Sequence, residues 1–303
     1  MSNILVVGSA NLDLVAFTDR LPRQGETLLG AFHSFEGGKG GNQAVAASRA
    51  GGKVAFLGRI GLDLFGARLR KSLQDNGVDT RLLGEVEGPS GVAVIMSGGG
   101  NNMIVVAPGA NDQLTEDAIA ADNFSGVGLV LAQLETPLPT IIKVARLARE
   151  KGIAFILDPA PARALPRELL ALVDWLTPNE SEAATLLGVK ELGDPLVAAK
   201  NLKALGPRGV VLKLGGAGAV LLEDDAPVLI PAHKVAVVDT TAAGDAFNGA
   251  FAVALSEGNA PPEAVRFAIA AAGISVTRHG AQPAMASRAE IDAFLASVQT
   301  GGN

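Results

Sequence analysis

A short stretch toward the C-terminus, Asp239-Thr240-Thr241-Ala242-Ala243-Gly244-Asp245, combines small residues with two carboxylates. It follows a β-branched run at residues 235–238, which predicts a strand, and precedes an alanine-rich segment at residues 246–255, which predicts a helix. The first N–H groups of a helix lack partners within the helix and carry partial positive charge, so this point can bind an anion. Asp245 stands beside it as a base able to take a proton from a hydroxyl.

An anion site with an adjacent base is the combination that phosphoryl transfer to an alcohol needs. Under this interpretation the catalytic segment is Ala242, Ala243, Gly244 and Asp245. The alternative is that Asp245 is an ordinary helix N-cap and that the alanines serve close packing. The segment alone leaves both interpretations open.

The composition disfavours several other kinds of site. The 303 residues are 48% hydrophobic with a formal net charge of −6 and no basic run, so nucleic acid and anionic membranes are poor partners. Cysteine is absent, which excludes disulfides and thiolate metal sites, and the three histidines lack zinc-ligand spacing. The start of the chain lacks the pattern of a signal peptide and no apolar run reaches membrane-spanning length, so we expect a cytoplasmic protein.

Apolar strands alternate with helical patterns along most of the chain. Strands are predicted at residues 4–8, 54–57, 128–134, 153–157, 175–177 and 210–214, and helices at residues 41–50, 139–151 and 264–276 and after Asp63 and Asn179. This alternation predicts an α/β fold with a parallel sheet between two layers of helices. Two segments, at about residues 12–36 and 91–107, break the rhythm and are expected to form a small additional sheet.

Two further motifs precede the Asp245 segment in the chain. A first glycine motif is Gly37-Gly38-Lys39-Gly40-Gly41-Asn42, and Asn179-Glu180-Ser181-Glu182 forms an Asn-x-x-Glu element. With these motifs the chain resembles, over nearly its whole length, the ribokinase/PfkB family of carbohydrate kinases, which also holds fructokinases and adenosine kinases. Residues 108–111 and 158–163 resemble the ribokinases of that family in particular.

The resemblance implies both a fold and an activity. The fold is a single domain over residues 1–303, a ribokinase-like three-layer α/β/α sandwich with a central, mostly parallel sheet and a small β-sheet lid. The activity is transfer of a phosphoryl group from ATP to O5 of D-ribose, with Mg²⁺ and with K⁺ as an activating monovalent cation. A homodimer through the lid is also expected. Deoxyribose, fructose or a nucleoside are alternative substrates, and a non-catalytic sugar sensor is an alternative of another class.

The resemblance also assigns a sugar-binding set. Its members are Asn11, Asp13, Gly38, Lys39, Gly40, Gly41, Asn42, Glu135 and Asp245. Asn11 and Asp13 follow the first predicted strand at alternate positions, so both side chains would face one way, and Asp13 suits a cis-diol. From the residues alone, a turn-stabilising Asn/Asp pair, a glycine-rich turn and a surface glutamate explain the same positions.

A nucleotide-binding set and one magnesium contact are implied in the same way. The nucleotide set is Asn179, Lys213, Leu214, Gly215, Gly216, Ala217, Gly218 and Gly244. Glu182 is expected to orient water on Mg²⁺, an ion that keeps several waters in proteins. Asn179 and Glu182 also fit a helix capping box, and residues 213–218 also fit a plain glycine turn between strands.

A monovalent-cation site is the last feature that the resemblance implies. Its members are Asp239, Thr241, Ser275, Arg278, Gly280 and Ala284. Most would contribute backbone carbonyls, with Asp239 supplying the charge. Ala284 replaces a residue that often offers a hydroxyl, which leaves the sixth ligand open. The alternative for Asp239 is a turn residue at the end of a strand.

Overall fold

The computed structural model describes residues 3–224 and 226–300, which form two separate sheets. The large sheet has the order β13-β12-β11-β10-β9-β8-β1-β4-β5. Its strands are β1 (Asn3–Val7), β4 (Val54–Gly61), β5 (Leu83–Val86), β8 (Val127–Ala132), β9 (Ala154–Leu157), β10 (Trp175–Leu176), β11 (Gly209–Lys213), β12 (Ala219–Leu222) and β13 (Val228–Ile230). Among its described strands, the antiparallel pairings are those of β12 with β11 and with β13. The predicted, mostly parallel sheet is therefore confirmed.

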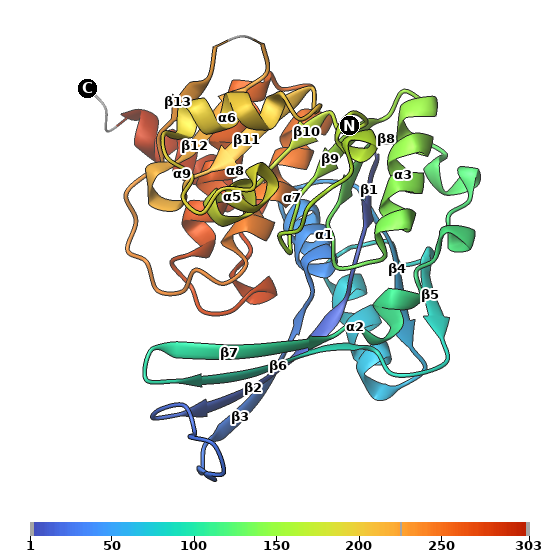
Figure 1. Ribbon diagram of the computed structural model, residues 1–303, viewed down its shortest axis with the longest axis vertical. Helices are drawn as coiled ribbons and strands as arrows, with labels where there is room; N and C mark the ends of the chain where they lie inside the picture. Colours follow the sequence, from blue (N-terminus) through green and yellow to red (C-terminus); the bar gives the residue numbers. More distant parts are fainter. Residues whose placement is uncertain (1–2, 225, 301–303) are drawn as a thin grey trace.

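Helices cover both faces of this sheet, as its continuous apolar strands require. One face carries α1 (Lys39–Arg49), α2 (Leu64–Asp75), α7 (Ala243–Ser256), α8 (Pro261–Ser275) and α9 (Arg288–Thr300). The other carries α3 (Leu138–Glu150), α4 (Arg167–Leu170), α5 (Glu180–Leu187) and α6 (Pro195–Lys203). Along β1, Ile4 and Val6 join the first core while Leu5 joins the second. The predicted three-layer α/β/α class is confirmed (Figure 1).

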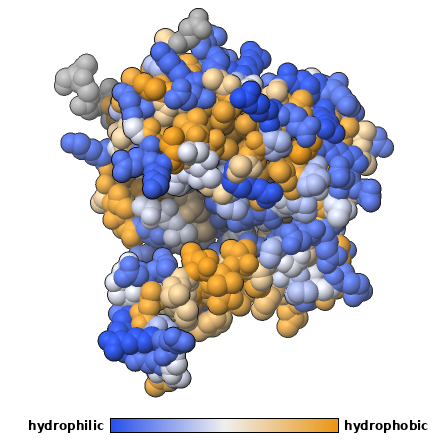
Figure 2. Space-filling view, in the orientation of Figure 1, coloured by the Kyte–Doolittle hydropathy of each residue, from blue (hydrophilic) through white to orange (hydrophobic). Residues whose placement is uncertain are grey.

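The small sheet has the order β3-β2-β6-β7 and projects from the main body (Figure 1). Its strands are β2 (Asn11–Thr18), β3 (Ala31–Gly37), β6 (Gly91–Gly98) and β7 (Asn101–Ala107), so the hairpin predicted at residues 91–107 is present. Every residue of β7 is exposed. Figure 2 shows a hollow between this sheet and the main body, and apolar side chains gather on the projecting part.

One predicted strand is wrong. Residues 235–238 form no strand, and Val237 and Val238 are 63% and 50% exposed. The N–H groups of Val238 and Asp239 donate to the carbonyl of Val276, just beyond α8, at 2.8 and 3.2 Å. β-Branched residues favour strands only where a neighbouring strand is available, and here a helix end satisfies the backbone instead.

Helices α1 and α7 begin earlier than predicted and pack closely together. They start at Lys39 and Ala243, so the small residues of both motifs belong to first helical turns. At their crossing, a Cβ on Gly249 would lie 2.6 Å from Ala46 Cβ and 2.8 Å from the carbonyl oxygen of Gln43. Asp245 lies one turn before Gly249, so this contact brings Asp245 against α1.

In the described part of the chain, no helix has the length and apolar character to cross a bilayer.

Candidate active site

A cavity of about 510 Å³ lies at the carboxyl end of the large sheet, where open α/β sheets bind ligands. Asp158 follows β9, Asn179 follows β10 and Lys213 ends β11, and all three line it. The start of α7 closes another side with Ala243, Gly244 and Asp245 among others. The structure therefore brings the predicted catalytic segment together with the predicted nucleotide-binding positions.

Asp245 is the third residue of α7, and its side chain is turned toward α1. The residue is 5% exposed; Asn42 Nδ2 donates to its Oδ2 at 3.0 Å and Gln43 Nε2 donates to its Oδ1 at 2.9 Å. The N-cap of α7 is Ala242, so the alternative of Asp245 as a helix cap is wrong. Burial and the nearby Asp158 carboxylate raise the pKa of Asp245, while Lys39 and the two amides oppose that rise.

The start of α7 exposes helix N–H groups to the cavity. Ala242 has a left-handed backbone conformation, with a φ of 57°. In the described part of the chain, it is the one residue other than glycine with a positive φ. The N–H of Ala243 donates to the Thr240 carbonyl at 3.2 Å, whereas those of Gly244 and Asp245 have no partner within residues 3–224 and 226–300. Unpaired N–H groups at a helix start, after a left-handed residue, form an anion-binding nest.

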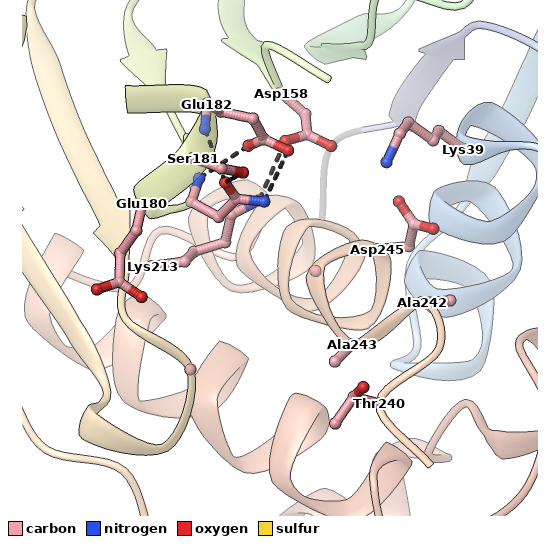
Figure 3. A pocket seen from close by; sticks show the side chains of 13 residues that line it. Lys39, Asp158, Glu180, Ser181, Glu182, Lys213, Thr240, Ala242, Ala243 and Asp245 are labelled. Atoms are coloured by element: carbon pink, nitrogen blue, oxygen red, sulfur yellow. Dashed lines mark hydrogen bonds and ion pairs between the residues drawn. The ribbon is translucent and has the colours of Figure 1, made fainter. Parts of the chain in front are cut away.

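Lys39 supplies one of the cations of the site. Its ammonium group points between Asp158 and Asp245 in Figure 3. Burial alone would lower the pKa of Lys39, but the carboxylates of Asp245, Asp158 and Glu135 outweigh it and raise that pKa. Lys39 therefore stays charged beside the carboxylate of Asp245.

Glu135 caps the start of α1 from outside the helix. Its Oε2 accepts from Ser9 Oγ at 2.6 Å and from the Lys39 N–H at 3.0 Å. Gly38, the N-cap residue, has no side chain for this task. The alternative of a surface glutamate is therefore wrong, because Glu135 is half-buried and one of its oxygens is committed to α1.

The first glycine motif allows backbone to contact backbone. A Cβ on Gly38 would lie 2.7 Å from the Asn11 nitrogen, and one on Gly40 would lie 2.6 Å from the Ser9 nitrogen. The Gly41 N–H donates to the Ser9 carbonyl at 2.8 Å. These glycines form the first turn of α1 and fit it against residues 9–11, so the alternative of a free glycine turn is wrong.

Asn11 and Asp13 lie at the start of β2, facing glycines that leave them room. Asn111 Nδ2 donates to Asn11 Oδ1 at 2.7 Å, which leaves the amide hydrogens of Asn11 to donate elsewhere. Cβ atoms on Gly91 and Gly37 would lie 2.2 Å from Asn11 Oδ1 and 2.4 Å from Asp13 Oδ2. Burial, then Glu135 and Asp245, raise the pKa of Asp13 from 3.8 to about 7.

Asn179 and Glu182 form the expected capping box while lining the cavity. Asn179 Oδ1 accepts from the Glu182 N–H at 2.9 Å, and the Asn179 N–H donates to Glu182 Oε2 at 2.8 Å. Burial and Asp158 raise the pKa of Glu182, and Lys213 opposes this rise. Among the residues described, no three His, Cys, Asp or Glu side chains gather in a way that could hold a metal ion. An ion bound mainly through its waters and a ligand's phosphates fits this donor set.

The loop at residues 213–218 contributes to the lining of this cavity and of a second one of about 570 Å³. Lys213 Nζ lies 3.0 Å from Asp158 Oδ1. The Leu214 N–H donates to the Gly218 carbonyl at 2.8 Å, which closes the loop. The loop therefore lies where one elongated ligand could occupy both cavities.

The second cavity is the part of the site that sequence motifs missed. Its apolar lining includes Val235, Val237, Phe247, Ile269, Ala272 and Val276. Lys213, Gly215, Thr240, Ala243 and Gly244 line both cavities. Apolar residues without a motif carry no signal in one sequence, so only the fold could reveal them.

The proposed cation-site residues lie on two segments that Asp239 joins. Asp239 Oδ1 accepts from the Thr241 N–H at 2.9 Å, and Oδ2 accepts from the Gly280 N–H at 2.9 Å. Burial would raise the pKa of Asp239, but these hydrogen bonds outweigh it and lower that pKa. Ser275 and Ala284 are buried, and the Arg278 side chain pairs with Glu290. The segments at 239–241 and 275–284 are thus adjacent.

Comparisons with known proteins identify the family. The model of the pfkB family carbohydrate kinases matches residues 1–288. The chain belongs to this family. It is 42% identical over 299 residues to a ribokinase of Bacillus subtilis, covering 97% of this chain and all of that one. It is 34% identical to a deoxyribokinase of Salmonella typhi, covering 97% and 98%. An Arabidopsis thaliana ribokinase, solved in complex with ribose and ATP, superposes with a TM-score of 0.91 at 36% identity, covering 97% and 98%.

Asp13→Asn is expected to stabilise the ligand-free protein at alkaline pH. The folded pKa of about 7 exceeds the ordinary 3.8, so the folded state binds the proton more tightly. The free energy of unfolding therefore falls as the pH rises between these values. Asparagine has no such proton, so the variant should be on the order of 4 kcal/mol more stable than the parent at alkaline pH, at about 1.4 kcal/mol for each pKa unit.

Denaturant unfolding measured across this pH range tests the prediction. The two proteins should converge at acidic pH, below both pKa values, where Asp13 is neutral in both states. Asp19→Asn, which changes an exposed carboxylate, is the matched control and should leave the pH dependence as it is in the parent. A constant difference between Asp13→Asn and the parent at every pH would show that burial does not hold the Asp13 proton.

Proposed function

We propose that the chain phosphorylates D-ribose at O5 with ATP. The observation that carries the proposal is the Asp245 carboxylate, held against Lys39 and Asn42 beside the unpaired N–H groups of α7. The names of the relatives and the ribose and ATP of the Arabidopsis complex support the choice of substrates. Family membership supports the reaction class.

The sugar is proposed to bind between the small sheet and the start of α1. Asn11 would donate from the amide that Asn111 orients, and the Asp13 carboxylate would accept from two neighbouring hydroxyls. Lys39 and Asn42 add donors, and Glu135 retains one oxygen for a hydroxyl. The backbone of Gly38, Gly40 and Gly41 would form the floor of the sugar site. The small sheet would act as the lid over this sugar, consistent with the hollow in Figure 2.

The reaction requires one proton transfer and one phosphoryl transfer. Asp245 accepts the proton of the O5 hydroxyl as that oxygen forms its bond to the γ-phosphorus, and the bond from phosphorus to the bridging oxygen of ADP breaks. The N–H groups of Gly244 and Asp245 stabilise the charge on the transferred group, with Ala242 and Ala243 shaping the turn. The Lys39 ammonium group also balances the negative charge on the transferred group. Positioning and electrostatics account for the catalysis, and the enzyme forms no covalent bond.

The nucleotide is proposed to span the two cavities. The phosphates of ATP would contact the side chains of Asn179 and Lys213 and the N–H of Gly244. They would also contact the loop from Leu214 to Gly218, where Ala217 offers only its backbone. The base would occupy the apolar second cavity. Bound Mg²⁺ would neutralise phosphate charge, with Glu182 holding one of its waters. The cytoplasm, where ATP is abundant, is the proposed compartment.

Steady-state turnover of ATP with ribose, deoxyribose, fructose and adenosine tests the proposal. Ribose should give the highest kcat/KM, because a site that binds hydroxyls leaves its own polar groups unpaired when one hydroxyl is missing. Asp245→Asn should lower kcat by about 100-fold or more while ribose and ATP still bind in calorimetry.

The outcomes separate the alternatives. If deoxyribose, fructose or adenosine gave a higher kcat/KM than ribose, the proposed substrate would be wrong and the proposed kinase activity would stand. Binding of ribose without turnover in the parent protein would support the sensor. Near-normal kcat in a folded Asp245→Asn variant would remove Asp245 as the base.

We also propose that K⁺ binds at Asp239, Thr241, Ser275, Arg278, Gly280 and Ala284 and activates the enzyme. The hydrogen bonds of Asp239 join the turn before α7 to the loop at Gly280, so a cation there would order the start of α7. Activity in desalted protein should be higher with K⁺ than with Na⁺ or tetramethylammonium. Asp239→Asn should reduce this difference. Equal rates with all three cations in the parent would contradict the site.

A homodimer through the small sheet is proposed on the strength of its exposed apolar surface. Met103, Ile104, Val105 and Val106 on the edge strand β7 are 48–68% exposed, and such an edge invites a partner. Light scattering should show a dimer. Val105→Glu should shift it toward monomer, whereas Val197→Glu, at an exposed valine on α6, should not. A parent protein that is monomeric at micromolar concentration would contradict this interface.

A further inference from the structure

A buried amide on α1, Gln43, joins two carboxylates of the site. Gln43 is 0% exposed, and its Nε2 donates to Asp245 Oδ1 at 2.9 Å and to Asp158 Oδ2 at 2.8 Å. A primary amide has two hydrogens to donate, so both are used. Gln43 is therefore the group that hydrogen-bonds to both buried carboxylates at once.

The orientation of this amide is fixed by a second one. Gln133 Nε2 donates to Gln43 Oε1 at 2.6 Å, and Gln133 is itself 1% exposed. Rotation of the Gln43 amide by half a turn would place its NH₂ against that of Gln133 and its oxygen against two carboxylates. A Cβ on Gly8 would lie 2.2 Å from Gln133 Oε1, so Gln133 is held closely as well. The network therefore has one orientation.

The amide connects the two ends of the site. Asp158 accepts from Gln43 on one oxygen, and its other oxygen pairs with Lys213 Nζ at 3.0 Å, at the start of the 213–218 loop. Asp245 lies at the end where the sugar is proposed to bind. The charged groups that interact with Asp245 are Lys39 on α1, Asp13 on β2 and Asp158 after β9. Glu180, Glu182 and Lys213 line the same cavity.

We propose that Gln43 is a positioning residue for phosphoryl transfer: its locked amide holds the Asp245 carboxylate in the orientation and ionised form that accepting a proton requires. The inference rests on the proposed role of Asp245 as the base. Burial and Asp158 raise the pKa of Asp245, and the hydrogen bonds from Gln43 and Asn42 act against that rise. A donor to a carboxylate stabilises its ionised form, so removing the amide should make Asp245 harder to deprotonate.

Gln43→Met tests the proposal, since methionine has a similar length and no donor. We expect kcat to fall about tenfold with the KM values for ribose and ATP little changed, because Gln43 is fully buried and lines neither cavity. We expect the acid limb of the kcat–pH profile to move up by about one pH unit, because the ionised base appears only at higher pH. A purely structural role would lower the amount of folded protein without moving this limb.

Two further variants keep the test decisive. Gln133→Met leaves both donors of Gln43 in place but releases their orientation, so it should move the acid limb in the same direction by less. Thr140→Val removes a buried hydrogen bond to the Leu114 carbonyl on the opposite face of the sheet and should leave the profile unchanged. If Gln43→Met does not fold, Gln133→Met decides: a shifted limb supports the proposal and a parental profile overturns it.

The result is separable from the assignment of the base. Parental kcat and pH profile in folded Gln43→Met, together with an inactive Asp245→Asn, would overturn the role of Gln43 alone. An active Asp245→Asn would instead remove the base on which the inference depends. A shift of the limb in Gln43→Met and an inactive Asp245→Asn are the combination expected.

Discussion

Burial of the Asp245 carboxylate between α1 and α7 is the interaction on which the arrangement of the site depends. An ionised carboxylate is costly to remove from water unless charge and hydrogen bonds compensate it. Here Lys39, Asn42 and Gln43 provide that compensation, and all three come from the first turns of α1. The start of α1 must therefore lie against the start of α7.

The glycines of the chain make this proximity possible. Gly38 and Gly40 bring the backbone of α1 against residues 9–11, and Gly249 brings α7 against α1. Inserting a methyl group where backbone atoms are already in contact forces helices apart, typically at 1–3 kcal/mol. A shift of a few tenths of an ångström at these glycines would change the hydrogen bonds to Asp245. The packing of these small residues therefore also determines how the Asp245 carboxylate is hydrogen-bonded.

Much of the fold could be predicted from the sequence, because continuous apolar strands and helical periodicity are local signals. The sheet, the helical layers and the hairpin of β6 and β7 follow from them. The strand predicted at residues 235–238 is wrong because β-branched content does not reveal whether a strand partner exists. The supporting contacts of Gln133 and Asn111 do not follow from the sequence, because they join residues 90 and 100 positions apart. No pattern along the chain marks such pairs.

The ligand-free site also carries features that work against stability. Ala242 adopts a left-handed conformation that costs about 1–2 kcal/mol for a residue with a Cβ. Asn42 Oδ1 is buried without a partner, and the Asp13 carboxylate accepts no hydrogen bond within residues 3–224 and 226–300. Strain and unpaired polar groups persist where function requires them. Hydroxyl groups and an anion are the ligands that would complete this set.

The same features bear on whether the protein catalyses or only binds. A sugar sensor would need Asn11 and Asp13 to recognise hydroxyls, and it could bind a nucleotide at the 213–218 loop. It would have no use for a carboxylate buried at 5% exposure, held by two amides and placed beside a cation at an anion-binding helix start. Burying that carboxylate costs folding free energy that binding alone does not demand. The position of Asp245 therefore favours an enzyme over a sensor.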